Sequence, residues 1–392
     1  MKASEKPKTN LKYYLRTFGC QMNVKDSENM AGVLEALGFT ETNKLEEAAV
    51  AIINTCSVRQ ASEDKVYGYG IKYKDIEKKD RPLTFITGCM IGSAKGKLKR
   101  YDLDYIKNKI KWADYFLAPQ EESQLPQILY KEGLIDEWGL KTIGKMDFED
   151  SAKREKGEMA LINISYGCDN FCTFCVVPYA RGTEISRDEK EILKEVEHAV
   201  MRGYSHIMLL GQNVNSWMLS PSQKLKTRKN IGKHPFASLL KKIHKIEGVS
   251  KISFITSNPW DFTPELVETL ALPKIERFLH LPVQSGSNKI LKAMNRKHTV
   301  EDYLELIADI KKQVPEMEFG TDVIVGFCGE TNEDFEKTVE LFKQVKFKVA
   351  FISKYSTRKG TPAEKFMKDD VTLKIKNERH RILMKVFEEN KK

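Results

Sequence analysis

The chain has 392 residues, enough for two domains that each bury a core of their own. Hydrophobic residues make up 41% and charged residues 31%, and no stretch approaches the roughly 18 consecutive apolar residues of a membrane-spanning helix, so a soluble globular protein is expected rather than a membrane protein. The formal net charge of +10 permits an acidic partner such as nucleic acid.

The cellular compartment is predicted from the first residues and from the cysteines. The opening stretch MKASEKPKTNLKYYL lacks the apolar segment of a secretory signal, which points to the cytoplasm, where thiols stay reduced. Seven cysteines are spread along the chain, and this odd number disfavours a disulfide framework. We therefore expect the cysteines to bind metal or to serve redox chemistry.

Residues 1–140 alternate strand-like and helix-like segments. Three apolar strand patterns end at a cysteine, and one helical pattern, closed by Gly38, lies between the first two. The expected elements are a strand at 12–20, a helix at 27–39, and strands at 49–56, 81–89 and 115–119. This alternation predicts a parallel α/β sheet.

A polar, charged stretch at 141–158 predicts a linker, and a longer α/β series follows it. Strands are expected at 160–165, 206–211, 251–256, 278–283, 320–326 and 348–355, with helical patterns between them. Six βα units in series predict a partial (β/α)6 barrel related to the eight-unit form, with a doubly wound sheet as the alternative. The predicted domains are 1–140 and 159–392, joined by the linker.

Cys168, Cys172 and Cys175 follow the first strand of this series with the spacing C-x3-C-x2-C. Loops at the carboxyl ends of barrel strands carry functional sites, and thiolates suit iron–sulfur clusters or zinc. A structural zinc and a [4Fe–4S] cluster both usually take four protein ligands, so three ligands would leave one iron open for a substrate or cofactor. The alternative is a zinc knuckle completed by a distant residue.

Cys20, Cys56 and Cys89 each end a predicted strand of the first domain. Parallel strands bring their carboxyl ends to one edge of a sheet, so these thiols are expected to converge on a second three-ligand metal site. Small buried apolar side chains are the alternative reading of the same residues. Cys328 has no partner at ligand spacing and is expected to be structural.

The triad of Cys168, Cys172 and Cys175, placed after strand one of a six-unit series, resembles the radical S-adenosylmethionine (SAM) superfamily, and two three-cysteine sites in this order resemble its methylthiotransferases. Among these, the chain is similar to the tRNA 2-methylthio-N6-dimethylallyladenosine synthases from about Lys12 to about Phe387. The stretches that carry the resemblance are TFGCQMNVKDSE (17–28), NTCSVRQASEDKVYG (54–68), GCDNFCTFCVVPYARGTEISR (167–187), LLGQNVNSW (209–217), LPVQSGSNKIL (281–291) and MNRKHT (294–299). Gln21, Met22 and Asn23, together with VVPYARG, favour this branch over those that act on a ribosomal protein or on threonylcarbamoyladenosine.

The resemblance implies two [4Fe–4S] clusters and SAM as cofactors. The open iron at Cys168, Cys172 and Cys175 would bind SAM and cleave it to a radical, and a sulfur at the other cluster would be methylated by a second SAM. The product would carry a methylthio group on C2 of N6-dimethylallyladenosine, adenosine-37 beside the tRNA anticodon. Because an aromatic C–H has no useful acidity, no general base is required, and the seven histidines are dispersed.

The resemblance also implies contacts to SAM from residues that follow the barrel strands. These are Phe174 near the adenine, Gln212 and Asn213 after the second strand, Ser257 after the third and Gln284 after the fourth. Further candidates are Arg181 for a carboxylate or phosphate, residues 323–326 for apolar contact with the adenine, and Trp217 or Phe327 for stacking on a base.

The expected partners are a tRNA anticodon stem-loop and an external reductant, with no membrane. Two basic stretches are candidates for RNA phosphates, namely Lys224, Lys226, Arg228, Lys229 and Lys233 in one loop, and Lys95, Lys97, Lys99 and Arg100 in another. The chain departs from the family in two ways. Family members usually continue into a small RNA-binding β-barrel called TRAM, whereas the sequence given stops at RHRILMKVFEENKK, either because it is truncated or because this version lacks the module; and Cys328 stands where proline is usual.

Three other functions are weighed against this hypothesis. Within the enzyme class, the substrate would be another tRNA nucleoside or a ribosomal protein. An iron–sulfur electron carrier or sensor without SAM chemistry is a second alternative, although a carrier would gain from fully ligated clusters. A zinc-binding RNA adaptor is the third.

Overall fold

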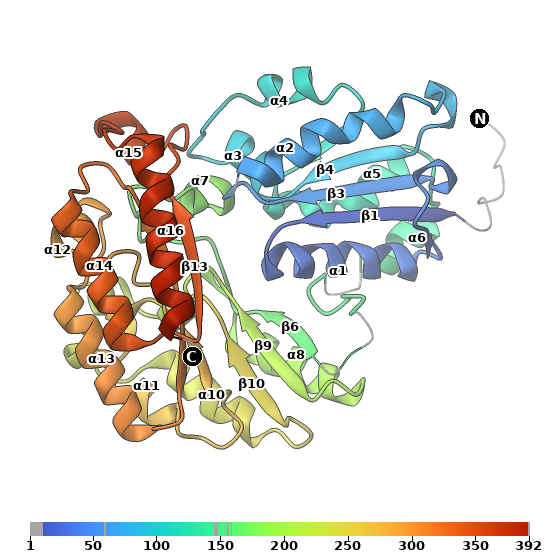
Figure 1. Ribbon diagram of the computed structural model, residues 1–392. Coiled ribbons are helices and arrows are strands. Elements are labelled where there is room, and N and C mark those ends of the chain that lie inside the picture. The colour runs from blue at the N-terminus through green and yellow to red at the C-terminus, as the bar shows by residue number, and fades with distance from the viewer. Residues whose placement is uncertain (1–10, 59, 145–147, 155–156, 158, 391–392) are drawn as a thin grey trace. The chain divides into compact units, whose positions relative to one another are not determined.

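The computed structural model describes residues 11–58, 60–144, 148–154, 157 and 159–390. The chain folds into two compact units (Figure 1). The first comprises Met1–Gly157 with Val176–Thr183, and the second comprises Glu158–Cys175 with Glu184–Lys392. The sequence-based division differs in keeping Val176–Thr183 with the barrel. Residues 145–147, 155–156 and 158 of the predicted linker lie outside the described residues.

The first unit is built on a five-stranded parallel sheet with the order β2-β1-β3-β4-β5. The strands are β1 (Lys12–Phe18), β2 (Thr40–Glu41), β3 (Val50–Thr55), β4 (Leu83–Thr87) and β5 (Tyr115–Leu117). The helices are α1 (Gln21–Ala36), α2 (Gln60–Tyr69), α3 (Cys89–Lys95), α4 (Leu103–Lys109), α5 (Leu125–Lys131), α6 (Glu137–Ile143) and α7 (Val177–Arg181). The predicted parallel α/β sheet is thereby confirmed, and β1, β3 and β4, which precede the three cysteines, are immediate neighbours.

Both faces of this sheet are covered, because successive residues of a strand point to opposite sides. Tyr14 of β1 belongs to a buried cluster with Val66 of α2 and Met90 of α3. Its neighbour Tyr13 belongs to a second cluster with Met30 of α1. Helices α1 and α2 accordingly lie on opposite sides of the sheet (Figure 1).

Helix α1 begins at Gln21, directly after Cys20, rather than at the predicted residue 27. The sequence prediction was wrong there because the first turns carry no apolar periodicity. Asn23, Lys25 and Asp26 are nevertheless buried, so tertiary contacts decide this end of the helix. At the other end, Gly38 has a φ of +85° just past the last turn, as predicted for the residue that terminates the helix.

Residues 149–153, which fall within the predicted linker, lie along α1. The ammonium of Lys25 donates to the carbonyl of Glu149 at 2.7 Å, and the backbone N–H of Lys153 donates to the carbonyl of Glu28 at 2.8 Å. A Cβ added to Gly32 of α1 would lie 1.7 Å from the carbonyl oxygen of Ser151. The glycine is therefore required for this segment to pack on the helix.

We expect Gly32→Ala to lower the free energy of unfolding, although alanine is the better helix former by about 1 kcal/mol, because the added methyl group displaces the Ser151 backbone. Gly68→Ala in α2 is the matched control, since a Cβ there meets nothing within 4 Å and should stabilise by up to about 1 kcal/mol. Urea denaturation followed by circular dichroism measures both, and a stabilising Gly32→Ala would contradict the contact.

The second unit contains six parallel strands in chain order. One sheet has the order β10-β9-β6 and another has the order β11-β12-β13, and a parallel bridge from Ile252 to Ile275 connects β10 to the segment before β11. The strands are β6 (Met159–Asn163), β9 (His206–Leu210), β10 (Lys251–Phe254), β11 (Phe278–His280), β12 (Glu318–Val325) and β13 (Val349–Lys354). This order confirms the predicted partial barrel over the doubly wound alternative.

Helices lie between the barrel strands and after the last of them. They are α8 (Glu189–Met201), α9 (Pro221–Lys224), α10 (Pro235–Lys245), α11 (Pro264–Thr269), α12 (Asn288–Ala293), α13 (Val300–Gln313), α14 (Asn332–Val345), α15 (Pro362–Phe366) and α16 (Leu373–Asn390). Helix α16 packs on α14 and β13 (Figure 1). Strand β7 (Ser165–Tyr166) pairs antiparallel with β8 (Ile185–Ser186) at the two ends of the cysteine-bearing segment. None of the described helices is long and apolar enough to cross a bilayer.

Candidate functional site

Cys20, Cys56 and Cys89 lie at one edge of the sheet of the first unit. Cys20 caps α1 after β1, Cys56 directly follows β3, and Cys89 opens α3 after β4. Because these strands are adjacent and parallel, their carboxyl ends meet at this edge. The thiols of Cys56 and Cys89 hydrogen-bond to each other, and burial of its sulfur together with the charge of Cys89 raises the pKa of Cys20.

Two glycines let the chain bring these cysteines close. Gly88 has a φ of +93°, and a Cβ there would lie 2.3 Å from Oδ1 of Asn54. A Cβ on Gly19 would lie 2.2 Å from Oδ1 of Asn23. Each cysteine that begins a helix is thus preceded by a glycine that allows a side chain from a neighbouring segment to approach the backbone.

Hydrogen-bond donors surround the sulfurs of this first triad. Arg181 donates from Nε to Sγ of Cys89 at 3.3 Å, and the backbone N–H of Val58 donates to Sγ of Cys56 at 3.3 Å. The hydrogen bond from Cys56, followed by the charge of Arg181, lowers the pKa of Cys89 well below that of an ordinary thiol. The environment therefore favours a thiolate at Cys89, which is the form that binds metal.

The loop with Cys168, Cys172 and Cys175 is anchored to the end of α12 and to α15 in the second unit. The backbone N–H of Thr173 donates to the carbonyl of Met294 at 3.1 Å, and its hydroxyl donates to the carbonyl of Ala293 at 2.9 Å. The backbone N–H of Ala363 donates to the carbonyl of Thr173 at 2.9 Å. The loop is held by segments far away in the sequence.

Polar side chains also approach the sulfurs of this second triad. The amide of Asn170 donates to Sγ of Cys168 at 3.5 Å, and Nη1 of Arg296 donates to Sγ of Cys172 at 3.7 Å. Burial, with a contribution from the neighbouring Cys175, raises the pKa of Cys168. The backbone turns sharply at Gly167 and Phe171, which have φ angles of +66° and +46°.

The donor chemistry of both triads fits an iron–sulfur cluster. Within the described part of the chain, no group of three or more His, Cys, Asp or Glu side chains is close enough to ligate one ion. A cubane cluster holds the sulfurs of its ligands farther apart than one ion does, and thiolates are its usual ligands. The three cysteines of each triad therefore match the usual donor atoms of a cluster.

Two of the residues predicted to contact SAM carry buried polar atoms without a partner. Asn213 donates from Nδ2 to a carboxylate oxygen of Asp261 at 2.8 Å, but its Oδ1 has no hydrogen bond within the described structure. The same is true of the Ser257 hydroxyl. Burial raises the pKa of Asp261 to about 6. Because buried polar groups are nearly always paired, these two atoms fit a polar ligand at the carboxyl ends of the strands.

Phe174, Gln212 and Gln284 are the other residues predicted to contact SAM. Phe174 is half-buried, with its ring 6.4 Å from that of Phe327 in an edge-on arrangement. Gln212 is half-buried beside Asn213. Gln284 has a φ of +74° and is hydrogen-bonded through its backbone to Asp322 at 2.9 Å. A left-handed residue other than glycine is uncommon and is often found at functional sites.

Several further candidates have other roles. Trp217 is 2% exposed and donates from its ring to the carbonyl of Arg187 at 3.1 Å, and Phe327 is 0% exposed, so neither offers a face to a base. Of the two partners predicted for Arg181, a carboxylate or a phosphate, the structure shows a carboxylate, that of Asp26, and Arg181 also donates to Sγ of Cys89. The predictions for Trp217 and Phe327 were wrong because sequence pattern does not distinguish a buried aromatic side chain from an exposed one.

The predicted basic stretches are partly neutralised. Ion pairs or hydrogen bonds join Lys224 to Glu184 (2.9 Å), Arg228 to Asp309 (2.7 Å), Lys229 to Glu305 (2.6 Å), Lys95 to Glu121 (2.5 Å) and Arg100 to Ser57 (2.7 Å). Lys97, Lys99, Lys226 and Lys233 are exposed. The surface available to phosphates is thus smaller than the lysine count indicates.

The sequence interpretation missed three residues beside the two sites. Arg296 lies in MNRKHT, a stretch quoted for the resemblance but assigned no role. Asn23 donates to Oδ1 of Asn54 at 3.0 Å next to the first triad. Asp261 pairs with Asn213. A positional signal existed only for Asn23, which lies three residues after a cysteine that caps a helix.

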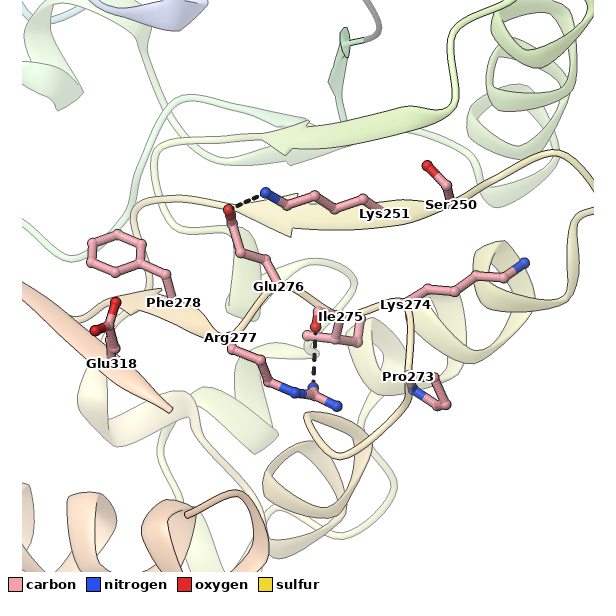
Figure 2. A pocket seen from close by; sticks show the side chains of 9 residues that line it. All are labelled: Ser250, Lys251, Pro273, Lys274, Ile275, Glu276, Arg277, Phe278 and Glu318. Carbon is pink, nitrogen blue, oxygen red and sulfur yellow. Dashed lines mark hydrogen bonds and ion pairs between the residues drawn. The ribbon is translucent and has the colours of Figure 1, made fainter. Parts of the chain in front are cut away.

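A pocket of about 460 Å³ opens at the amino ends of the barrel strands β10, β11 and β12 (Figure 2). Lys251, Phe278 and Glu318, the first residues of β10, β11 and β12, line it, and Lys251 forms an ion pair with Glu276. Barrel enzymes carry their sites at the carboxyl ends of the strands, where the cysteine loop lies. This pocket is therefore separate from the candidate site.

Comparisons with known proteins match both units. The model of the Radical SAM superfamily matches residues 162–342, and the model described as Uncharacterized protein family UPF0004 matches residues 12–106. The tRNA-2-methylthio-N(6)-dimethylallyladenosine synthase of Carboxydothermus hydrogenoformans is 42% identical over 373 residues, covering 94% of this chain and 81% of the relative. The protein of the same name from Thermotoga petrophila is 40% identical over 375 residues, covering 95% and 81%.

Solved structures share the fold. A radical S-adenosylmethionine methyltransferase from Kitasatospora setae, with cobalamin and a [4Fe-4S] cluster bound, aligns with a TM-score of 0.63 at 13% identity over 91% of this chain and 74% of its own. The cobalamin-dependent S-adenosylmethionine radical enzyme OxsB aligns with a TM-score of 0.55 at 12% identity over 97% of this chain and 56% of its own. At such low identity these likenesses concern the fold alone.

Proposed function

Because the chain belongs to the family of tRNA-2-methylthio-N(6)-dimethylallyladenosine synthases within the radical SAM superfamily, we propose that it adds a methylthio group to C2 of N6-dimethylallyladenosine in tRNA. The observation that carries the proposal is the pair of cysteine triads, one in each unit and each at the carboxyl ends of parallel strands. A site with one triad alone would indicate only the superfamily.

The residues of each triad would hold one [4Fe–4S] cluster. Cys168, Cys172 and Cys175 would hold the cluster that binds SAM, and the first triad, Cys20, Cys56 and Cys89, would hold the auxiliary cluster. When bound, the clusters supply the electron that cleaves SAM and a site for the sulfur that is transferred. Because each triad supplies three cysteine ligands, each cluster would keep one open coordination position, for SAM at one cluster and for the transferred sulfur at the other.

The side chains around the second unit's loop would bind and orient SAM. The free Oδ1 of Asn213 and the Ser257 hydroxyl supply hydrogen-bonding atoms that need a polar partner. Phe174 offers a half-exposed ring for the adenine. Arg296 fixes the loop, because it donates to Cys172 and, at 2.7 Å, to the carbonyl of Pro282. Gln212 and Gln284 complete the proposed set.

The proposed partners are a tRNA anticodon stem-loop and an external reductant. The names of the relatives support a tRNA substrate. The exposed lysines at 97, 99, 226 and 233 would give a salt-dependent contribution to binding RNA. We place the reaction in the cytoplasm, where tRNA is found and where thiols stay reduced.

Mass analysis of tRNA nucleosides tests the substrate. In a strain that lacks this protein, N6-dimethylallyladenosine should accumulate without its 2-methylthio form, and a plasmid-borne copy of the chain should restore that form. A strain that keeps the modification would contradict the proposal. A methylthio group lost from another nucleoside or from a ribosomal protein would identify the alternative substrates.

A further inference from the structure

Helix α7 follows Cys175 in the sequence but belongs to the first unit. It packs on α3, the helix that begins with Cys89. A Cβ added to Gly92 of α3 would lie 1.9 Å from the carbonyl oxygen of Ala180, and one added to Gly96 would lie 3.0 Å from that of Tyr179. The backbone of α7 is thus in close contact with α3 where both glycines lie.

Arg181, the last residue of α7, is 3% exposed and uses its guanidinium twice. Nε donates to Sγ of Cys89 at 3.3 Å, and Nη2 forms an ion pair with Asp26 at 2.6 Å. The carbonyl of Arg181 accepts a hydrogen bond from the side chain of Gln120 at 2.8 Å. A planar guanidinium held from both sides can keep one N–H directed at one sulfur.

Two carboxyl groups are buried beside this guanidinium. Burial raises the pKa of Asp26 to about 6 and raises the pKa of Glu122 well above its usual value, and the charge of Arg181 opposes both shifts. Glu122 accepts a hydrogen bond from the hydroxyl of Thr87 at 2.5 Å. Arg181 is therefore the cation that offsets buried negative charge at Cys89.

We propose that Arg181 is a positioning residue for the auxiliary cluster: its Nε–H holds the sulfur of Cys89, and its charge raises the reduction potential of that cluster. Hydrogen bonds to ligand sulfurs and local charge are the means by which a protein tunes such a cluster. Asp26 fixes the plane of the guanidinium. The inference rests on the proposed assignment of Cys20, Cys56 and Cys89 as cluster ligands.

The test uses the full chain with Cys168, Cys172 and Cys175 replaced by alanine, so that only the auxiliary cluster is reconstituted. A potentiometric titration followed by electron paramagnetic resonance gives its reduction potential. Arg181→Met should bind the same amount of iron at a more negative potential. The potential of the double variant Arg181→Met/Asp26→Asn should lie between those of the two single variants, because it loses one charge of each sign, and it leaves no carboxylate buried without its partner.

Asp26→Asn alone separates tuning from a structural role. It removes a buried negative charge and keeps the arginine, so the potential should move in the positive direction, opposite to Arg181→Met. Potentials unchanged in both variants, or shifted in the same direction, with iron retained, would overturn the inference. If the chain in which Cys168, Cys172 and Cys175 are replaced by alanine binds no iron, the proposed cluster ligands are contradicted instead, so the two failures are distinguishable.

Discussion

Cys172→Ala should abolish the reductive cleavage of SAM and lower the iron content of the anaerobically reconstituted protein from about eight to about four atoms per chain. Cys172 is buried, and its sulfur accepts a hydrogen bond from Arg296, so the substitution removes one of the three proposed ligands of its triad. The measurements are iron analysis and detection of 5′-deoxyadenosine after addition of SAM and a strong reductant.

Cys328→Ala is the matched control for this substitution. Cys328 is 8% exposed and belongs to an apolar cluster with Ile290, Met294 and Phe327. Its replacement should cost stability but leave the iron content and SAM cleavage unchanged. Retained cleavage in Cys172→Ala would contradict the assignment of the second triad. Stoichiometric zinc in place of iron, with no cleavage in the parent chain, would favour the zinc-binding adaptor.

Cys56→Ala should abolish the methylthiolation of tRNA while preserving SAM cleavage. Cys56 lies in the first unit at the end of β3, whereas the loop of Cys168, Cys172 and Cys175 is anchored by α12 and α15 in the second. Iron should again fall to about four atoms per chain, because one cluster is lost and the other keeps its ligands. Nucleoside analysis and 5′-deoxyadenosine formation separate the two effects.

Val58→Ala is a useful companion to this variant. Val58 is exposed, and it contacts Cys56 through its backbone N–H, which alanine keeps. The iron content and the modification should therefore be close to those of the parent chain. Loss of SAM cleavage in Cys56→Ala would contradict the independence of the two triads.

The positions of the cysteines followed from local pattern. Each thiol of the first triad comes directly after an apolar strand segment, and the carboxyl ends of parallel strands necessarily meet. The cysteines of the second triad lie in one short stretch, residues 168–175, so their spacing is visible in the sequence itself. The strand pattern also predicted the order of βα units, because alternation between period 2 and period 3.6 depends on nearby residues only.

The polar side chains beside the sulfurs are placed there by contacts between segments that are distant in the sequence. Asn23, Lys25 and Asp26 lie in a stretch without apolar periodicity, so the sequence did not place them in a buried helix. Trp217 and Phe327 were interpreted as exposed stacking partners, yet both are buried. Burial depends on what packs against a residue, and local composition does not contain that information.

The sequence by itself determined the two cysteine triads, the parallel α/β architecture and the resemblance that led to the family, because these depend on spacing along the chain. Only the tertiary structure decided that α7 packs with the first unit and that Arg181 donates to Cys89. The reason is physical. The close approach of α7 depends on the glycines of α3, and the direction of the guanidinium depends on Asp26, which lies 155 residues away in the sequence.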